Sequence, residues 1–147
     1  QTMPDMLPDR LESGTHNMPG IAGLLEGICY VQRTGVETIA AHERRLTAQA
    51  VALLRQTEGI RLFWRDGLRH QTGVLSFVVE GVDCEELGEA LARQGIALRA
   101  GLHCAPLAHR TVGTLKTGTV RFSPSAFNTS QQVVQFAQIL QRTIRKM

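Results

Sequence analysis

Short strand-like segments alternate with amphipathic helices along this chain, and this alternation restricts its fold more than any other feature. Residues 60–64 (IRLFW) and 74–79 (VLSFVV) are rich in β-branched and aromatic residues, and the turn-like stretch 65–73 separates them. Residues 96–100 (IALRA) and 119–122 (TVRF) alternate like half-buried strands. These segments predict one small sheet.

Apolar residues at helical spacing predict helices around this sheet. The helices cover about residues 21–32, the stretch from Gly35 to Gly59, residues 83–94, and the segment from Thr129 to about Ile144. The order ααββαββα predicts an α+β fold, an α/β sandwich of helices on a small sheet. Capping boxes mark two helix starts, at Asp83 with Glu86 and at Thr129 with Gln132.

Length and composition predict one globular domain with a real core, because the chain has 147 residues of which 43% are hydrophobic and 20% charged. No stretch is apolar for long enough to span a membrane. The chain begins at Gln1 without a signal segment, so we expect a piece of a longer polypeptide. Three widely spaced cysteines without a C-x-x-C motif argue against a disulfide framework or a zinc ribbon and favour the reducing cytoplasm.

Charge is unevenly distributed along the chain. All 13 carboxylates lie at or before Glu89, whereas residues 90–147 hold eight lysines and arginines and no acid. Such a segment is expected to bind anions. Only 5% of the residues are aromatic and no run of lysine or arginine exceeds two, which argues against nucleic acid and favours a small anionic ligand.

Two arginines occupy corresponding places in the last two predicted strands. Alternation places Arg99 on the face opposite Ile96 and Leu98, and Arg121 on the face opposite Val120 and Phe122. If both strands pack their apolar faces on the helices, the arginines converge on the open face. The alternative is that they are two solvated arginines at the edge of the sheet.

The three cysteines have different surroundings. Cys29 lies in an apolar helix and is expected to be a small core residue. Cys84 is expected to be exposed near a helix N-terminus, where neighbouring acids oppose a thiolate. Cys104 has cationic neighbours and no acid within fourteen residues on either side, which favours a thiolate. The cations and histidines around Cys104 are Arg99, His103, His109 and Arg110.

Cys104 is therefore either a reactive thiol or an ordinary loop thiol, and Gly101 and Gly113 allow a mobile or tightly turned loop around it. A metal site built from His103, Cys104 and His109 is disfavoured, since adjacent side chains rarely converge on one ion and no further ligand is close. Cysteine-protease chemistry lacks any sign of an oxyanion hole.

Three separated motifs carry a family resemblance. LRAGLHCAP (98–106) and GTVRFSPSAFNT (118–129) closely resemble the C-terminal part of the class V aminotransferase-like, pyridoxal phosphate-dependent cysteine desulfurases with the motif R-x-G-x-H-C. Upstream, RLESGTHNMPGIAGL (10–24) is similar to the family's E-x-G-T-x-N stretch, and a helix containing HERRL (42–46) follows. The resemblance covers residues 7–144 and implies the small domain of fold-type I enzymes, with a short, mostly antiparallel sheet against helices.

The resemblance implies a role for each matching residue. Cys104 corresponds to the nucleophile that takes the sulfur of L-cysteine as a persulfide and releases alanine. Arg121 corresponds to the arginine that binds the substrate carboxylate, and Arg99 is expected beside it. Thr15, with Gly14, corresponds to the residue that reaches the phosphate of pyridoxal 5'-phosphate in the partner subunit of a homodimer.

The chain departs from the family pattern at the cofactor. Its only lysines, Lys116 and Lys146, are not in the context of the lysine that forms the Schiff base, and the large domain is missing. We therefore expect residues 1–19 to be an extended segment from the large-domain junction and residues 20–147 to be a C-terminal small domain that is inactive alone. A sulfur-acceptor protein is a further expected partner. The alternatives are a domain of another class V enzyme, an aminotransferase or a selenocysteine lyase, and a non-catalytic interaction module of the same fold.

Overall fold

The computed structural model describes residues 4–12, 14–65 and 71–147 and divides the chain into two compact units, Gln1–Val36 and Glu37–Met147. Residues 66–70 of the predicted turn lie outside the described residues. None of the described helices combines the length and the apolar character that a membrane span requires.

The first unit contains a short 3-10 helix, η1 (Asp9–Leu11), and the helix α1 (Met18–Thr34). Helix α1 begins three residues before the predicted start at residue 21, because the side chain of Asn17 accepts a hydrogen bond from the backbone N–H of Gly20 at 3.0 Å. No residue of α1 is buried. The prediction that Cys29 is a core residue is therefore wrong: it is only partly buried, on a helix whose apolar side chains remain exposed.

The second unit is built on a four-stranded sheet with the order β1-β2-β4-β3. Its strands are β1 (Ile60–Phe63), β2 (Leu75–Val79), β3 (Arg99–Gly101) and β4 (Thr119–Phe122). All three pairings are antiparallel, so the predicted small antiparallel sheet is confirmed.

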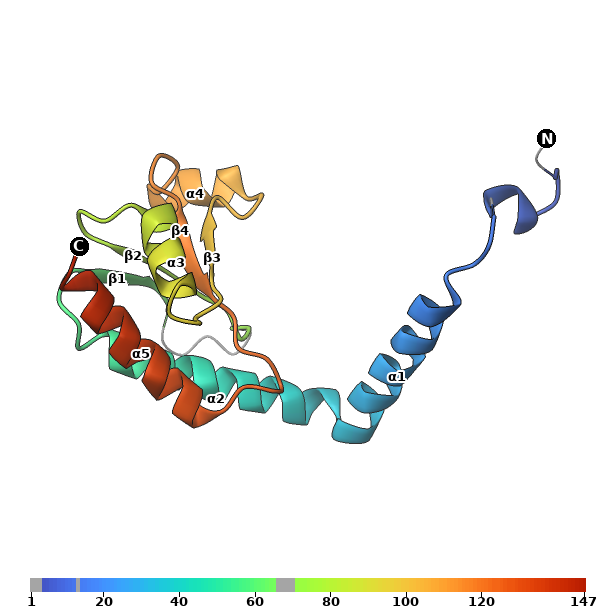
Figure 1. Cartoon of the computed structure of the whole chain (residues 1–147), viewed down its shortest axis with the longest axis horizontal. Helices are drawn as coiled ribbons and strands as arrows, with labels where there is room; N and C mark the ends of the chain where they lie inside the picture. The colour runs from blue at the N-terminus through green and yellow to red at the C-terminus, as the bar shows by residue number, and fades with distance from the viewer. Residues whose placement is uncertain (1–3, 13, 66–70) are drawn as a thin grey trace. The chain divides into compact units, whose positions relative to one another are not determined.

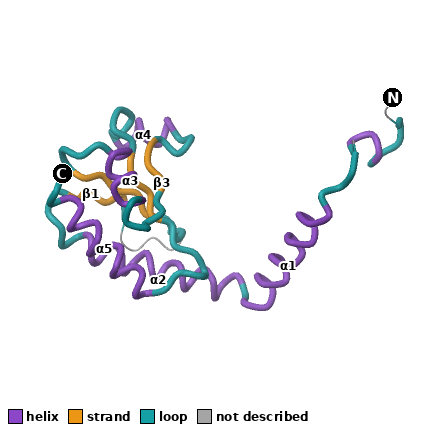
Figure 2. Tube along the Cα trace, viewed as in Figure 1, coloured by secondary structure: helices purple, strands orange, loops and turns teal. Residues whose placement is uncertain are grey.

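Helices α2 (Val36–Leu54), α3 (Cys84–Ala92) and α5 (Ser130–Ile144) supply the other half of the core of this unit. Both traces show α2 and α5 along one side of the sheet (Figures 1 and 2). The side-chain amide of Gln49 in α2 donates to the carbonyl of Ser130 at the start of α5, and that of Gln141 in α5 donates to Oγ1 of Thr57, three residues after α2. Each strand contributes its alternate apolar residues to this core. The core side chains that are fully buried include Leu46, Leu54, Leu75, Phe77, Leu87, Leu91, Val120 and Leu140.

Helix α4 (Pro106–Val112) was not predicted from the sequence. It lies between the end of β3 and the start of β4 (Figure 1). It has only seven residues and no side-chain cap at Ala105, so it lacks both an apolar stripe and a start signal. Pro106 in its first turn and Gly113, at φ 76° in the left-handed region, mark its ends.

The predicted strand at residues 96–100 is shifted toward its C-terminal end. Only Arg99–Gly101 pair with β4, whereas Ile96 and Leu98 leave the ladder and pack against the core. The final helix is as predicted, because Thr129 and Gln132 form the expected capping box.

Candidate functional site

The two arginines lie side by side on one face of the sheet. Arg99 and Arg121 are direct partners in the antiparallel pairing of β3 with β4, so both side chains leave the same face. On the opposite face, Val120 is 0% exposed within the core. The predicted convergence of the arginines on the open face is confirmed.

This pairing creates an attraction for an anion. Two cations directly across a strand pair repel each other, and an anion between them removes that repulsion. Arg99 is exposed, whereas Arg121 is partly buried. Among the described residues, the Nε of Arg121 has no hydrogen-bond partner although it is buried. A buried guanidinium N–H without a partner is an available donor for a ligand carboxylate.

His103 lies between this arginine pair and the cysteine loop. Its Nε2 is 3.1 Å from Oγ1 of Thr119, which is almost fully buried. Burial lowers the pKa of His103, and the positive charge of the Arg121 guanidinium lowers it further, whereas the hydrogen bond with Thr119 opposes this shift. Its Nδ1 is buried and has no hydrogen-bond partner within the described part of the chain. His103 is therefore neutral at pH 7 and lines the site while its ring contacts Thr119.

Cys104 projects from a tight turn at the end of β3. The backbone N–H of Ala105 donates to the carbonyl of Leu102 at 2.9 Å, which closes the turn around His103 and Cys104. Both central residues have left-handed backbones, with φ of 51° and 57°. Such a conformation costs about 1–3 kcal/mol for each non-glycine residue and persists where the surroundings enforce it. The turn leaves the side chain of Cys104 exposed.

The sequence interpretation did not give His109 and Thr114 their actual role. The sequence suggests His109 as a cationic neighbour of the thiol or a disfavoured metal ligand, but its ring is buried and its Nδ1 is 2.8 Å from Oγ1 of Thr114. Within the described ranges, no group of three or more histidine, cysteine or acidic side chains could hold a metal ion. The spacing of a histidine and a threonine across Gly113 is the signal that could have indicated this pair.

Cys84 differs from the prediction in its exposure. Its side chain is 7% exposed, since the start of α3 packs against the loop before β4. Burial raises the pKa of the Cys84 thiol, and the carboxylates of Asp83 and Glu85 raise it further. The expected resistance to ionisation is thus present, but burial contributes most of it.

Gly14 and Thr15 belong to the first unit, and both are exposed. Gly14 has φ of 105°, a conformation that side-chain-bearing residues rarely adopt. The contacts of Arg99, Arg121 and His103 described above all come from residues of the second unit.

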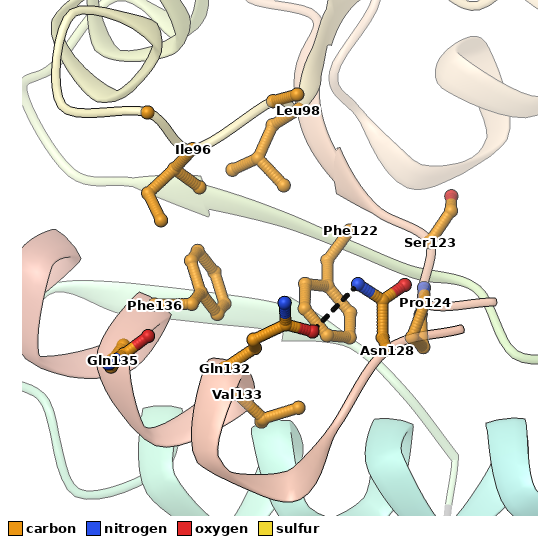
Figure 3. Close-up of a pocket in the computed structure, with 12 residues that line it drawn as sticks. Ile96, Leu98, Phe122, Ser123, Pro124, Asn128, Gln132, Val133, Gln135 and Phe136 are labelled. Atoms are coloured by element: carbon orange, nitrogen blue, oxygen red, sulfur yellow. Dashed lines mark hydrogen bonds between the residues drawn. The ribbon is translucent and has the colours of Figure 1, made fainter. Parts of the chain in front are cut away.

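A cavity of about 330 Å³ lies between the segment before β3, the end of β4 and the start of α5 (Figure 3). Ile96, Leu98, Phe122 and Phe136 form its apolar wall, and Asn128 hydrogen-bonds to Gln132 at its rim at 3.2 Å. None of the predicted site residues lines it. The candidate site is therefore the open arginine face with the cysteine turn, rather than this cavity.

The fold and the site define the class: an α+β domain that presents two paired arginines on one face of its sheet and an exposed thiol beyond the end of β3. Residues 2–136 match the family described as Aminotransferase class-V. The chain belongs to this family.

Its relatives are cysteine desulfurases. The chain is 44% identical over 135 residues to a cysteine desulfurase of Synechococcus elongatus, covering 92% of this chain and 21% of that protein. It is 34% identical over 140 residues to a probable cysteine desulfurase of Xylella fastidiosa, covering 95% of this chain and 32% of that protein. The apo structure of cysteine desulfurase from Thermococcus onnurineus matches with a TM-score of 0.83 and 30% identity, over 95% of this chain and 34% of that one. The chain thus spans a fifth to a third of the length of these relatives.

The residues of this chain fit a carboxylate better than they fit pyridoxal phosphate. Pyridoxal phosphate is anchored by a lysine, and the chain has only Lys116 and Lys146. Lys116 is exposed beside a second cavity that Cys84 and Arg61 also line, and Lys146 is exposed after the end of α5. The arginine pair has donors for a carboxylate, but the described residues form no lysine-centred cofactor site.

Proposed function

We propose that this chain is the C-terminal domain of a pyridoxal phosphate-dependent cysteine desulfurase, to which it contributes the sulfur-accepting Cys104 and the carboxylate-binding Arg121. The observation that carries the proposal is the pairing of Arg99 with Arg121 in strands β3 and β4, together with an exposed cysteine in a left-handed turn three residues beyond the end of β3. A carboxylate between the arginines would place the rest of a small amino acid close to the turn.

The arginines bind and orient the substrate in this proposal. The partnerless Nε of Arg121 donates to one carboxylate oxygen, and the planar guanidinium fork can donate a second, parallel hydrogen bond. Arg99 is more exposed and adds positive charge on the same face. Neutral His103 limits the positive charge of the site to these guanidinium groups.

Cys104 receives the sulfur. Its sulfur forms a bond to the sulfur of L-cysteine, the carbon–sulfur bond of the substrate breaks, and the freed carbon takes up a proton to give L-alanine. The two substrate electrons of the broken bond stay with carbon, and the enzyme retains a persulfide. Bound pyridoxal phosphate supplies the electron sink that makes this bond cleavable. An acceptor protein would then take the persulfide sulfur from the exposed turn.

The remaining parts of the proposal concern the whole protein. We keep the division into a junction segment, residues 1–19, and a small domain, residues 20–147. Thr15 and Gly14 are exposed and free to reach the phosphate of a cofactor held by another subunit of a homodimer. Three free cysteines are compatible with the cytoplasm. This chain alone is expected neither to bind the cofactor covalently nor to convert cysteine.

Mass spectrometry of the whole protein after addition of L-cysteine tests the role of Cys104. An extra sulfur is expected on the peptide that contains Cys104, and Cys104→Ala is expected to abolish alanine formation while cofactor absorbance persists. Cys29→Ala is the matched control and is expected to retain activity. Alanine formation by Cys104→Ala at the wild-type rate would reject the proposal and favour other class V chemistry.

Arg121→Lys in the whole protein tests carboxylate binding. Lysine keeps the charge but loses the fork, so kcat/KM for L-cysteine is expected to fall on the order of 100-fold, mainly through KM. Arg61→Lys is the control, because Arg61 lies over the ring of Phe63, 4.9 Å from its centroid, in the strand at the other edge of the sheet. Equal kcat/KM values for the two variants would exclude Arg121 from substrate binding.

A further inference from the structure

Four polar side chains contact one another at the turn that carries Cys104, and we call them the latch: the partly buried His103 and the buried His109, Thr114 and Thr119. His109, Thr114 and Thr119 are 5%, 1% and 2% exposed, respectively. A buried polar side chain is costly unless it is hydrogen-bonded, and these residues bond to one another in pairs.

The first pair closes the end of α4. Nδ1 of His109 is 2.8 Å from Oγ1 of Thr114, and the backbone N–H of Thr114 donates to the carbonyl of His109, also at 2.8 Å. These two bonds surround the left-handed Gly113. The backbone N–H of His109 also donates to the carbonyl of Ala105 at 3.2 Å, so the pair is connected to the residue directly after Cys104.

The second pair holds the residue directly before Cys104. Nε2 of His103 lies 3.1 Å from Oγ1 of Thr119 in β4. The rings of His103 and His109 contact each other, with centroids 5.8 Å apart and planes tilted by 46°. The latch therefore contacts Cys104 through both chain neighbours, from β4 on one side and from α4 on the other.

This arrangement accounts for the left-handed backbone of His103 and Cys104. Neither residue is glycine, yet both have φ above 50°. Residues in such conformations relax toward extended or right-handed backbone unless neighbouring contacts hold them. The two histidine–threonine pairs and the contact between the two histidine rings connect α4 to β4 at the turn.

We propose that His109 and Thr114 are positioning residues that hold the turn of Cys104 in its left-handed form through His103 and Ala105, and so place the sulfur for reaction. The kinetic part of this inference rests on the proposed function. The conformational part does not, because the reactivity of Cys104 toward a small alkylating reagent can be measured without substrate.

The test compares two substitutions of Thr114 in the whole protein. Thr114→Val keeps the shape but removes the hydroxyl that bonds to His109, whereas Thr114→Ser keeps the hydroxyl. Thr114→Val is expected to change the rate of iodoacetamide alkylation at Cys104 by about 5-fold or more and to lower kcat about 10-fold with KM nearly unchanged. Thr114→Ser is expected to keep both the alkylation rate and kcat within about 2-fold of wild type. Thr111→Val, at an exposed position of the same helix, is the control.

The outcomes separate this inference from the proposed function. Wild-type alkylation and kcat in Thr114→Val would overturn the latch. A wild-type protein without desulfurase activity would remove the proposed function, while the alkylation rates would still decide about the latch. If Thr114→Val exposes Cys84 to iodoacetamide, the variant has unfolded. Thr119→Val then replaces it, since it removes only the bond to His103 and is expected to give the same change at Cys104; wild-type alkylation there would also overturn the latch.

Discussion

Cys84 and Cys104 lie near the same end of the sheet, yet their surroundings are opposite. Cys84 is the first residue of α3, and its sulfur is packed so closely against Gly118 that a Cβ added there would be 2.8 Å from it. Cys104 is only three residues beyond the end of β3, but its turn projects the side chain into solvent. Two acids, Asp83 and Glu85, raise the pKa of the Cys84 thiol. Cys104 instead comes after Arg99 and His103 in the chain, and Arg99 pairs with Arg121.

The difference shows that a few backbone angles separate a structural thiol from an accessible one. Cys84 occupies the first turn of an ordinary helix that Asp83 caps through the backbone N–H groups of Glu85 and Glu86. Cys104 occupies a left-handed turn that no helix or strand could continue. The energy stored in this turn is compensated by the buried polar contacts beneath it.

The largest expected difference between the two regions is in alkylation. Cys104 in the folded protein is expected to react with iodoacetamide on the order of 1,000-fold faster than Cys84, which must wait for an opening of α3. Peptide mass spectrometry at increasing times measures both rates in one sample. In guanidinium chloride the rates are expected to converge, and similar rates in the folded state would contradict the comparison.

A methyl group at Gly118 tests the close packing around Cys84. Gly118→Ala requires both a left-handed alanine, at φ 64°, and a Cβ only 2.8 Å from the sulfur and 3.0 Å from the backbone of Gly101. We expect the free energy of unfolding to fall by about 3 kcal/mol.

Gly113→Ala is the matched control for this prediction. Gly113 has a similar φ of 76°, but a Cβ there would meet nothing within 4 Å, so the loss is expected to be about 1 kcal/mol. Urea unfolding followed by circular dichroism measures both variants. Equal losses would show that the backbone angle alone, and not packing against Cys84, makes Gly118 necessary.

The sequence predicted these two regions unequally. Alternation in the two strands predicted that Arg99 and Arg121 lie on one face if both strands pack their apolar faces on the helices, and the pairing of β3 with β4 meets this condition. The burial of Cys84 could not be predicted, because it depends on the close approach of Gly118 and Gly101, which are distant in the sequence.

The errors in the fold have similar causes. Residues 96–98 alternate like a strand, but pairing with β4 stops at Arg99, and Ile96 and Leu98 instead line a cavity together with Phe122. Helix α4 is stabilised by contacts at its ends, including the bond between His109 and Thr114, rather than by an apolar stripe. Local periodicity contains neither kind of information.

The smallest expected effect is a difference in the pH dependence of stability between the two regions. The pKa of His103 is lowered below its ordinary value of 6.5, so the unfolded chain binds its proton first as the pH falls. Stability from neutral His103 is therefore complete above pH 6.5 and is lost as the pH falls through the folded pKa. The pKa of Cys84 is raised above 9.0, so its contribution is complete below pH 9.0 and is lost as the pH rises through the folded pKa.

Two substitutions separate these opposite dependences. His103→Gln is expected to flatten the pH dependence of the free energy of unfolding below about pH 6.5 relative to wild type, and Cys84→Ala is expected to flatten it above about pH 9. Urea titrations at each pH measure the slopes, and the difference from wild type cancels the carboxylates that titrate in both proteins. If His103→Gln leaves the acidic slope unchanged, burial and the positive charge of Arg121 do not hold His103 neutral, and the surroundings of the Cys104 turn do not differ from the acidic surroundings of Cys84 in this respect.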